Sequence, residues 1–412
     1  MSNKNWFRKA GLGLFVHYQA SSILGRGEWV KYQENLTNEE YYSSINQFTV
    51  KNCDPEEWVK LAKSTGMKYA VLTAKHHDGY CLFKTKTTSL SCCNFDNSQD
   101  IVGKFVKACR KHNIKIGLYF SLPDWSKEAF FIGPDKDKEG WKQFLKYTKI
   151  QLTELFTQYG KIDLLWYDNI IGQSGDRQLT SDDYKSRRMN KEIRKLQPDI
   201  LINDRSLIDE DFYTAEQSCD GPSVAERLWE ACYTSNKHWA YFPADNNWKT
   251  ATELIHILSG CASKGGNLLL NVGPNPEGLV PYENYKSLKS LGEWMENNGE
   301  AIYGTKFCNY NAGTSGVFTL KGNVLYLIVH WWHGNKIVLP NCMFELKEAS
   351  FLSSKQKINF EYRNNNLILN NLPKKSPDKY CTVIKLKVKK FINSETKLVE
   401  TNFRNQLNTH KD

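Results

Sequence analysis

The sequence predicts an α/β protein: a (β/α)8-like barrel over residues 1–300, irregular in strands five to seven, and a C-terminal antiparallel β-sandwich with a polar tail over 301–412. Strand-like and helix-like segments alternate along the first 300 residues, as in βα units. Residues 69–73 and 162–168 resemble buried strands that end in polar or aromatic groups, and barrels carry their sites at such strand ends. After Gly304, short alternating runs are separated by Asn, Gly and Pro, which is typical of a sandwich.

Eight strands are expected in the barrel, and each is a short apolar run. They cover residues 12–17, 69–76, 114–120, 162–168, 199–203, 212–216, 227–230 and 267–272. No clear helix separates the fifth, sixth and seventh of these strands. This part of the barrel is therefore expected to be irregular.

The helices between the strands follow from apolar residues at helical spacing and from their capping residues. Asp54 can cap the first of them, with Pro55 at the position where a helix tolerates a missing N–H. The longest helix places Trp141, Phe144 and Leu152 on one side. The expected helices cover residues 55–64, 100–112, 140–159, 181–196, 249–263 and 282–298.

The net charge of +10 does not come from the barrel. Residues 301–412 contain 17 Lys and Arg against 7 Asp and Glu, whereas residues 1–300 contain 38 of each sign. A neutral barrel does not require a polyanionic substrate, and the scattered C-terminal lysines are expected to be solvated, so no nucleic-acid partner is expected. No stretch approaches the ~20 apolar residues of a membrane span, so no such span is expected either.

The eleven cysteines, two of them adjacent at Cys92 and Cys93, do not form the pattern of a disulfide framework or a zinc site. Free thiols in a reducing compartment are the simplest interpretation. The start of the chain lacks the apolar stretch of a signal peptide. The chain as it stands is therefore expected to be cytoplasmic, whereas removal of a leader would make it secreted or periplasmic.

The ends of the expected strands supply most of the residues that could carry chemistry. They are His17, His76, His77, Asp78, Tyr119, Trp166, Asp168, Asn203, Arg205, Glu216 and Glu230. A catalytic metal is not expected, because His76 and His77 would point to opposite sides of an ideal strand and no His pair is spaced i, i+4 on a helix. A serine hydrolase is not expected, because no G-x-S-x-G motif occurs. No cofactor is indicated.

Glycoside hydrolysis fits these residues better. It needs one carboxyl group that attacks or activates water and one that protonates the leaving oxygen. It also needs aromatic faces against which a sugar can pack. Asp168 offers a nucleophile beside Trp166, which lies two residues earlier on the same strand face. Glu216 and Glu230 compete for the acid role.

Several motifs resemble those of the α-L-fucosidases of glycoside hydrolase family 29, and they occur in that family's order. They are GLGLFVH at 11–17, GEWV at 27–30, GMKY at 66–69, KHHDG at 75–79, Gly-Leu-Tyr at 117–119 and KGGNLLLNVGP at 264–274. LWYD at 165–168 resembles the nucleophile segment of the family. Together these motifs span about residues 6–300. The C-terminal sandwich also matches the layout of the family.

The resemblance implies a retaining exo-α-L-fucosidase that releases terminal L-fucose from oligosaccharides or glycoconjugates, with Asp168 as the nucleophile. The fucose pocket that it implies consists of His17, Glu28, Trp29, His76, His77, Tyr119, Trp166 and Arg205. Fucose is a 6-deoxy sugar, so aromatic rings can pack on its methyl group and apolar face while the histidines and Glu28 hold its hydroxyls. Each paired hydroxyl would reject analogues that lack it.

The position of the acid/base residue varies between members of the family. YTAEQ at 213–217 resembles one acid/base segment, which favours Glu216, and LWEAC at 228–232 resembles another, which leaves Glu230 as the alternative. The chain departs from the family at one point. It has His17, Tyr18 and Gln19 where the family usually has His-Trp-Gly, and loss of this glycine would reshape the nearby loop.

Two alternatives remain open: a catalytically weak or inactive fucose-binding protein, and a retaining glycosidase of different sugar specificity. Linkage preference depends on loops, for which residues 172–182 and 239–243 are the candidates. The sequence does not indicate an oligomeric state.

Overall fold

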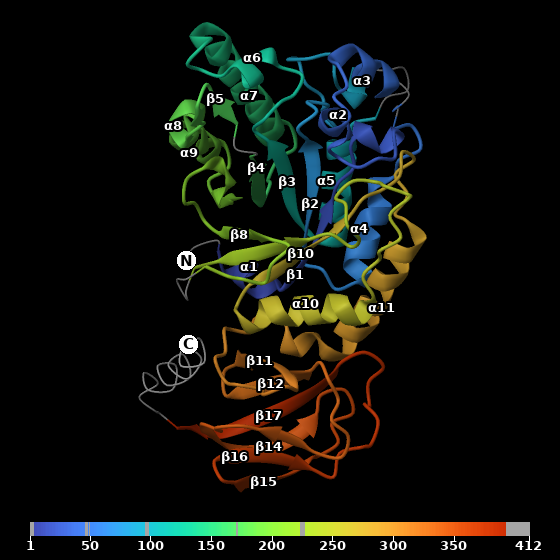
Figure 1. Ribbon diagram of the computed structural model, residues 1–412, viewed down its shortest axis with the longest axis vertical. Helices are drawn as coiled ribbons and strands as arrows, with labels where there is room; N and C mark the ends of the chain where they lie inside the picture. Colours follow the sequence, from blue (N-terminus) through green and yellow to red (C-terminus); the bar gives the residue numbers. More distant parts are fainter. Residues whose placement is uncertain are drawn as a thin grey trace, which may run out of the picture. The chain divides into compact units, whose positions relative to one another are not determined.

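The fold is described from a computed structural model of the chain (Figure 1). The structure describes residues 4–45, 48, 50–94, 99–169, 172–222 and 227–392. The chain divides into two compact units, Met1–Phe307 and Cys308–Asp412. The polar tail expected at the C-terminus lies outside the described residues from position 393 onward.

Eight parallel strands form the main sheet of the first unit, in the order β7-β4-β3-β2-β1-β10-β9-β8. A parallel bridge between Asn203 and Phe212 links the two edge strands, so the sheet curls round to meet itself. The predicted barrel-like fold is confirmed. The strands are β1 Leu12–Val16, β2 Tyr69–Lys75, β3 Lys115–Ser121, β4 Leu164–Asp168, β7 Leu201–Ile202, β8 Tyr213–Glu216, β9 Trp229–Tyr233 and β10 Asn267–Val272.

The expected irregularity is most marked at β7, which has only two residues. Side chains replace the missing part of its hydrogen-bond ladder. The Asn203 amide accepts from the Tyr167 N–H at 2.9 Å and donates to the Tyr167 carbonyl at 2.8 Å. On the other side, Asp211 accepts from the Ile202 N–H at 2.9 Å. These bonds satisfy backbone groups that would otherwise be unpaired inside the protein.

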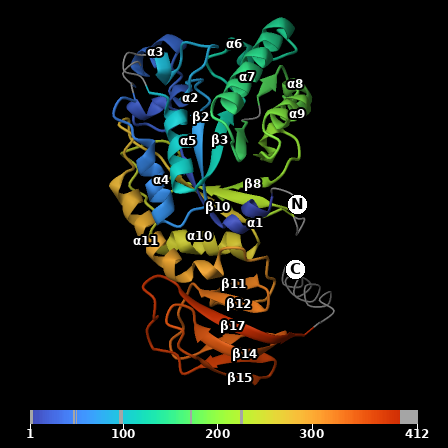
Figure 2. The ribbon, with the colours of Figure 1, turned by 180° about the vertical axis from the view of Figure 1, so that it is seen from behind.

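Helices cover the outside of the sheet, and Figure 2 shows α4 and α5 side by side. Asp54, Asp100 and Thr250 each accept an N–H from the first turn of the helix that follows them. Among the described residues, no helix is both long and apolar enough to cross a membrane. The longer helices are α4 Pro55–Ser64, α5 Ile101–His112, α7 Lys138–Gln158, α10 Ala251–Ser263 and α11 Tyr282–Asn298, and the shorter ones are α1 Asn5–Ala10, α2 Val30–Gln33, α3 Asn38–Ser44 and α6 Glu128–Ile132.

The prediction of one continuous helix over residues 181–196 is wrong. Lys185 has a φ of 55°, in the left-handed region, and this interrupts the helix. The segment therefore forms α8 Ser181–Tyr184 and α9 Ser186–Leu196. It follows a small hairpin of β5 Gln173–Ser174 and β6 Arg177–Gln178.

Inward-facing side chains fill the barrel. Phe15, Tyr69, Trp166 and others belong to one buried cluster. Helix α1 precedes β1 and adds Phe7, whose ring centre lies 4.7 Å from that of Phe212 and 5.7 Å from that of Tyr69. Because α1 packs at the N-terminal ends of the strands, a site for a ligand has to lie at their C-terminal ends.

The second unit is an antiparallel β-sandwich, as predicted. One sheet has the order β11-β12-β17-β14 and the other has the order β13-β16-β15. Apolar residues from both sheets, including Leu327, Leu369 and Leu386, share one buried core. The strands are β11 Gly316–Lys321, β12 Val324–Val329, β13 Ile337–Leu339, β14 Phe344–Phe351, β15 Asn359–Arg363, β16 Asn366–Asn370 and β17 Thr382–Phe391.

All eleven cysteines of the chain are free thiols, and seven of them are buried. Their state agrees with the expectation drawn from their spacing. The compartment in which the protein works stays a prediction.

Candidate active site

A cavity of about 200 Å³ is lined by residues at the C-terminal ends of the barrel strands. Asp168 ends β4 and Glu216 ends β8, and both line this cavity. The structure also brings the eight residues predicted for the sugar pocket to the same wall: His17, Glu28, Trp29, His76, His77, Tyr119, Trp166 and Arg205. The remaining lining residues are Phe15, Asn169, Cys232 and Trp239. We call this cavity the rim pocket.

Asp168 is surrounded by donors. Its Oδ1 accepts from Arg205 Nη1 and from the Asn169 N–H, both at 2.9 Å, and its Oδ2 accepts from the Tyr119 hydroxyl at 2.8 Å. Burial alone would raise the pKa of Asp168, but the Arg205 charge and these donors outweigh it and lower the pKa to about 2. The carboxylate is therefore ionised at neutral pH, as a nucleophile has to be.

Arg205 connects the two carboxylates of the pocket. It lies in the short 3-10 helix Asp204–Ser206 after β7. Its Nη1 bonds Asp168, and its Nη2 bonds Glu216 Oε2 at 2.6 Å. The guanidinium carbon lies 4.8 Å from the centre of the Trp166 ring. Asp168 and Glu216 are thus held one guanidinium group apart, with Glu216 the more exposed (42% of its side chain against 18%).

Glu230, the alternative acid, lies in a deeper layer of the barrel. The register of β8 and β9 pairs Glu216 with Cys232 and Thr214 with Glu230. Glu216 and Cys232 therefore reach the rim, whereas Glu230 lies two residues further inside. Its Oε1 accepts from Trp166 Nε1 at 2.7 Å and its Oε2 from the Tyr69 hydroxyl at 2.5 Å. It is inaccessible to solvent and does not line the rim pocket.

The buried position of Glu230 predicts a pH dependence of stability. Burial raises its pKa from 4.5 to about 7, and the hydrogen bonds from Tyr69 and Trp166 offset only part of this effect. Between these two pH values the folded protein binds a proton that the unfolded chain has released. The contribution of Glu230 to the free energy of unfolding should therefore fall as the pH rises from about 4.5 to about 7.

Glu230→Gln removes this titration and serves as the comparison. Chemical denaturation of both proteins across the window should give a wild-type free energy of unfolding that falls relative to that of the variant as the pH rises. A difference that stays constant with pH would contradict the raised pKa.

The three histidines of the pocket are neutral at neutral pH. Burial lowers the pKa of His17 and His77 to about 4 and that of His76 well below its usual range. His17 Nδ1 lies 2.6 Å from Asn271 Oδ1, which can only accept, so His17 Nε2 is left as an acceptor. His76 Nδ1 has no hydrogen-bond partner among the described residues. Neutral rings of this kind can bond sugar hydroxyls.

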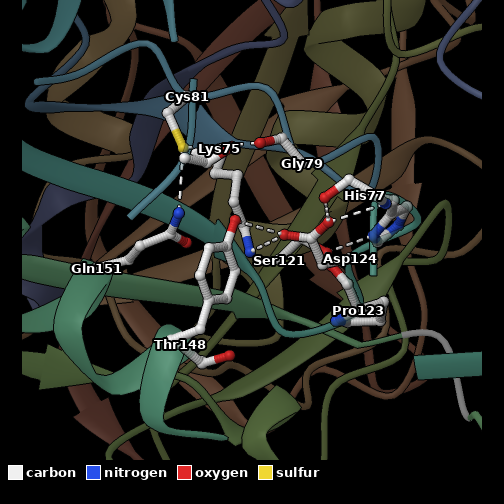
Figure 3. Close-up of polar contacts among 12 residues, drawn as sticks. Lys75, His77, Gly79, Cys81, Ser121, Pro123, Asp124, Thr148 and Gln151 are labelled. Carbon is white, nitrogen blue, oxygen red and sulfur yellow. Dashed lines mark hydrogen bonds and ion pairs between the residues drawn. The ribbon is translucent and has the colours of Figure 1, made fainter. Parts of the chain in front are cut away.

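A buried ion pair supports the turn that carries His77 (Figure 3). Lys75 Nζ lies 3.1 Å from Asp124 Oδ2, and neither side chain is accessible to solvent. The next residue, Trp125, donates its N–H to the His77 carbonyl at 2.7 Å. Ser121 Oγ donates to the Pro123 carbonyl and lies 2.6 Å from His77 Nδ1. His77 Nδ1 must then donate to Ser121, which leaves Nε2, on the side of Asp168, as an acceptor.

The expectation that His76 and His77 point to opposite sides is wrong. Strand β2 ends at Lys75, so strand alternation no longer applies to the two histidines. Both rings line the pocket, with centres 4.3 Å apart. His76, His77 and Asp168 offer ligand atoms within 4.8 Å of one another, so this group could hold a metal ion by geometry. The Arg205 cation beside Asp168 opposes a second positive charge there.

Aromatic rings form one wall of the pocket. The Tyr119 ring stacks on Trp166 at 5.6 Å and on His76 at 5.5 Å. Across the pocket, two loops meet: Glu28 Oε2, in the loop between β1 and α2, accepts the N–H groups of Trp239 and Ala240 after β9, at 3.2 and 3.0 Å. Burial raises the pKa of Glu28. Aromatic ring faces and polar side chains are thus combined in one small cavity, as recognition of a single sugar ring requires.

Sequence reasoning missed four residues of this region: Phe15, Asn169, Cys232 and Trp239. Phe15 could have been found, because it lies two residues before His17 on the same strand face. Cys232 could have been found too, because it lies two residues after Glu230 on the same face of its strand. The sequence places Trp239 only in a loop, and five residues of irregular chain separate it from the end of β9. No periodicity could have placed it.

A barrel that holds paired carboxylates beside an aromatic wall at its mouth has the arrangement of a glycoside hydrolase. A sequence profile of the family described as Alpha-L-fucosidase matches residues 1–300. The chain belongs to this family, glycoside hydrolase family 29, whose members are retaining exo-acting enzymes. The predicted family and class of enzyme are confirmed.

Relatives and solved structures agree with this assignment. The chain is 31% identical to the tissue alpha-L-fucosidase of Homo sapiens over 364 residues, which are 81% of this chain and 77% of that protein. It is similar to alpha-L-fucosidase isoenzyme 1 from Paenibacillus thiaminolyticus, with 33% identity, a TM-score of 0.86 and coverage of 94% and 99% of the two chains. It is also similar to an alpha-L-fucosidase from Bacteroides thetaiotaomicron solved as a trapped covalent intermediate with 2-fluoro-fucosyl fluoride (26% identity, TM-score 0.85, coverage of 94% and 96%).

Proposed function

We propose that the protein releases terminal α-linked L-fucose from oligosaccharides or glycoconjugates, with Asp168 as the nucleophile and Glu216 as the acid/base residue. The observation that carries this proposal is the bridge through Arg205. It holds an ionised carboxylate and a more exposed carboxyl group on the wall of one sugar-sized cavity. Glu230 is the weaker candidate, because both of its oxygens are engaged below the floor of that cavity.

The proposed reaction has two steps. In the first, Asp168 attacks the anomeric carbon, the bond to the leaving oxygen breaks, and Glu216 gives that oxygen its proton. In the second, Glu216 takes a proton from water, which attacks the same carbon and breaks the ester to Asp168. Two inversions leave the anomeric configuration retained.

The shape of the rim pocket supports removal of a single terminal sugar. A cavity of about 200 Å³ leaves little room beyond one ring. Tyr119 and Trp166 offer faces for the methyl group and apolar side of fucose. His17 and His77 each present an acceptor nitrogen to its hydroxyls.

A panel of nitrophenyl glycosides tests the proposal. The protein is expected to hydrolyse the α-L-fucoside and to leave the other sugars nearly untouched. Proton NMR should show α-fucose as the first product, before it mutarotates. Binding of fucose without turnover would favour the inactive fucose-binding alternative, and turnover of another glycoside alone would favour a different sugar specificity.

A further inference from the structure

We propose that a second cavity beside the rim pocket is a subsite for the neutral oligosaccharide that carries the fucose; this inference rests on the proposed function. The cavity has a volume of about 420 Å³. It is lined by the segment that follows β9 and by the segment from the end of β10 into α11. Both segments follow the C-terminal ends of barrel strands, so the cavity opens on the same rim as the active site.

One five-residue segment, 239–243, separates the two cavities. Trp239 lines the rim pocket, and the four residues after it line the second cavity. Five residues span at most about 15 Å, so the two cavities are close neighbours. A saccharide that leaves the rim pocket over Trp239 would reach the second cavity directly.

This wall is fixed in place. Glu28 accepts the backbone N–H groups of Trp239 and Ala240. Asn271 Nδ2 donates to the Trp239 carbonyl at 2.6 Å. A Cβ added to Gly273 would lie 2.7 Å from that carbonyl oxygen, so glycine is needed for the close approach. Asn271 also contacts His17 in the rim pocket and lines the second cavity. The two cavities are therefore coupled through one amide side chain.

The lining of the second cavity suits a neutral saccharide. It combines asparagine amides, such as Asn246, with aromatic rings, such as Trp248 and Tyr282. Among the described residues, the lining contains the acidic Glu283 and no lysine or arginine, so it offers a polyanion no counter-charge. Amides bond hydroxyls and rings pack on sugar faces.

Asn284 adds a buried polar side chain to the lining of the cavity. It lines the cavity, it is 2% exposed, and its Oδ1 has no hydrogen-bond partner among the described residues. Its side-chain oxygen is covered by the protein, so the exposed groups of the lining are the ones that a sugar could contact. Tyr282 also lines the cavity and is 72% exposed, so its ring is open to contact with a sugar.

The test compares Tyr282→Ala with Tyr285→Ala. Both tyrosines lie on α11 and are exposed, but Tyr285 does not line the cavity. Each variant and the wild type are assayed on an aryl α-L-fucoside, whose aglycone offers no sugar ring to the second cavity, and on neutral fucosylated tetra- and pentasaccharides. We expect Tyr282→Ala to lower kcat/KM for the oligosaccharides about tenfold through KM, with the aryl fucoside unchanged. Tyr285→Ala should match the wild type on both substrates.

A direct binding measurement accompanies the kinetics. The defucosylated tetrasaccharide, titrated into wild-type protein, should bind, and it should bind about tenfold more weakly to Tyr282→Ala. Equal kinetics of Tyr282→Ala and wild type on every oligosaccharide would overturn the subsite while leaving the fucosidase intact. An equal loss on aryl fucoside and oligosaccharide would overturn it too, since it would point to a structural effect. Failure of the wild type on the aryl fucoside would instead overturn the proposed function.

Discussion

Asp168→Ala is expected to lower the turnover of an aryl α-L-fucoside by about a thousandfold or more, because it removes the group that we propose forms the covalent bond to the sugar. The loss should appear in kcat rather than in KM, since the histidines and aromatic rings that would hold fucose stay in place. Steady-state kinetics on a nitrophenyl α-L-fucoside measure both parameters.

Asp168→Asn is the matched control, because it keeps the size of the side chain and part of its hydrogen bonding to Arg205 and Tyr119. It should be as inactive as the alanine variant. Azide added to Asp168→Ala should restore turnover and give β-fucosyl azide, because the anion then attacks the substrate directly from the vacated face. Near-wild-type activity in either variant would rule out the proposed nucleophile.

Glu216→Ala is expected to lower kcat by about a hundredfold to ten-thousandfold on substrates with poor leaving groups, since protonation of the leaving oxygen is lost. On an activated aryl fucoside the first step needs little acid, so the covalent intermediate should accumulate. Azide does not need a base and should restore turnover, giving α-fucosyl azide. The configuration of the azide product thus separates a missing acid/base residue from a missing nucleophile.

Glu230→Ala is the comparison for this experiment. Its side chain lies one layer below the rim pocket, so its loss should disturb Trp166 and Tyr69 and lower stability without creating a response to azide. Azide rescue of Glu230→Ala but not of Glu216→Ala would exchange the two roles. Thermal unfolding of both variants shows which of them affects the packing of the barrel.

The architecture could be predicted from the sequence because apolar runs and their polar ends mark the strands of a barrel. The choice between Glu216 and Glu230 could not. Both residues belong to short strands with similar patterns, and only the register of β8 against β9 places one at the rim and the other two residues deeper. A single sequence does not show how two strands are aligned against each other when it is not known which strands pair.

The interrupted helix and the two histidines show a similar limit. The break at Lys185 depends on one backbone angle that the helical pattern on either side does not reveal. The joint orientation of His76 and His77 depends on where β2 stops, and the ends of elements are the part of a structure that local patterns define least well. The apolar pattern predicts that β2 exists, but it does not predict the residue at which the strand ends.

Arg205 has a consequence for the timing of the proposed reaction. While the enzyme is free, its guanidinium shares one positive charge between two acidic neighbours. Esterification of Asp168 by the sugar cancels one of those negative charges, and Glu216 then becomes the remaining counterion. The guanidinium that bonds two carboxyl groups in the free enzyme is then directed at Glu216 alone, so that a single cation orients first the nucleophile and then the residue that activates water within each catalytic cycle.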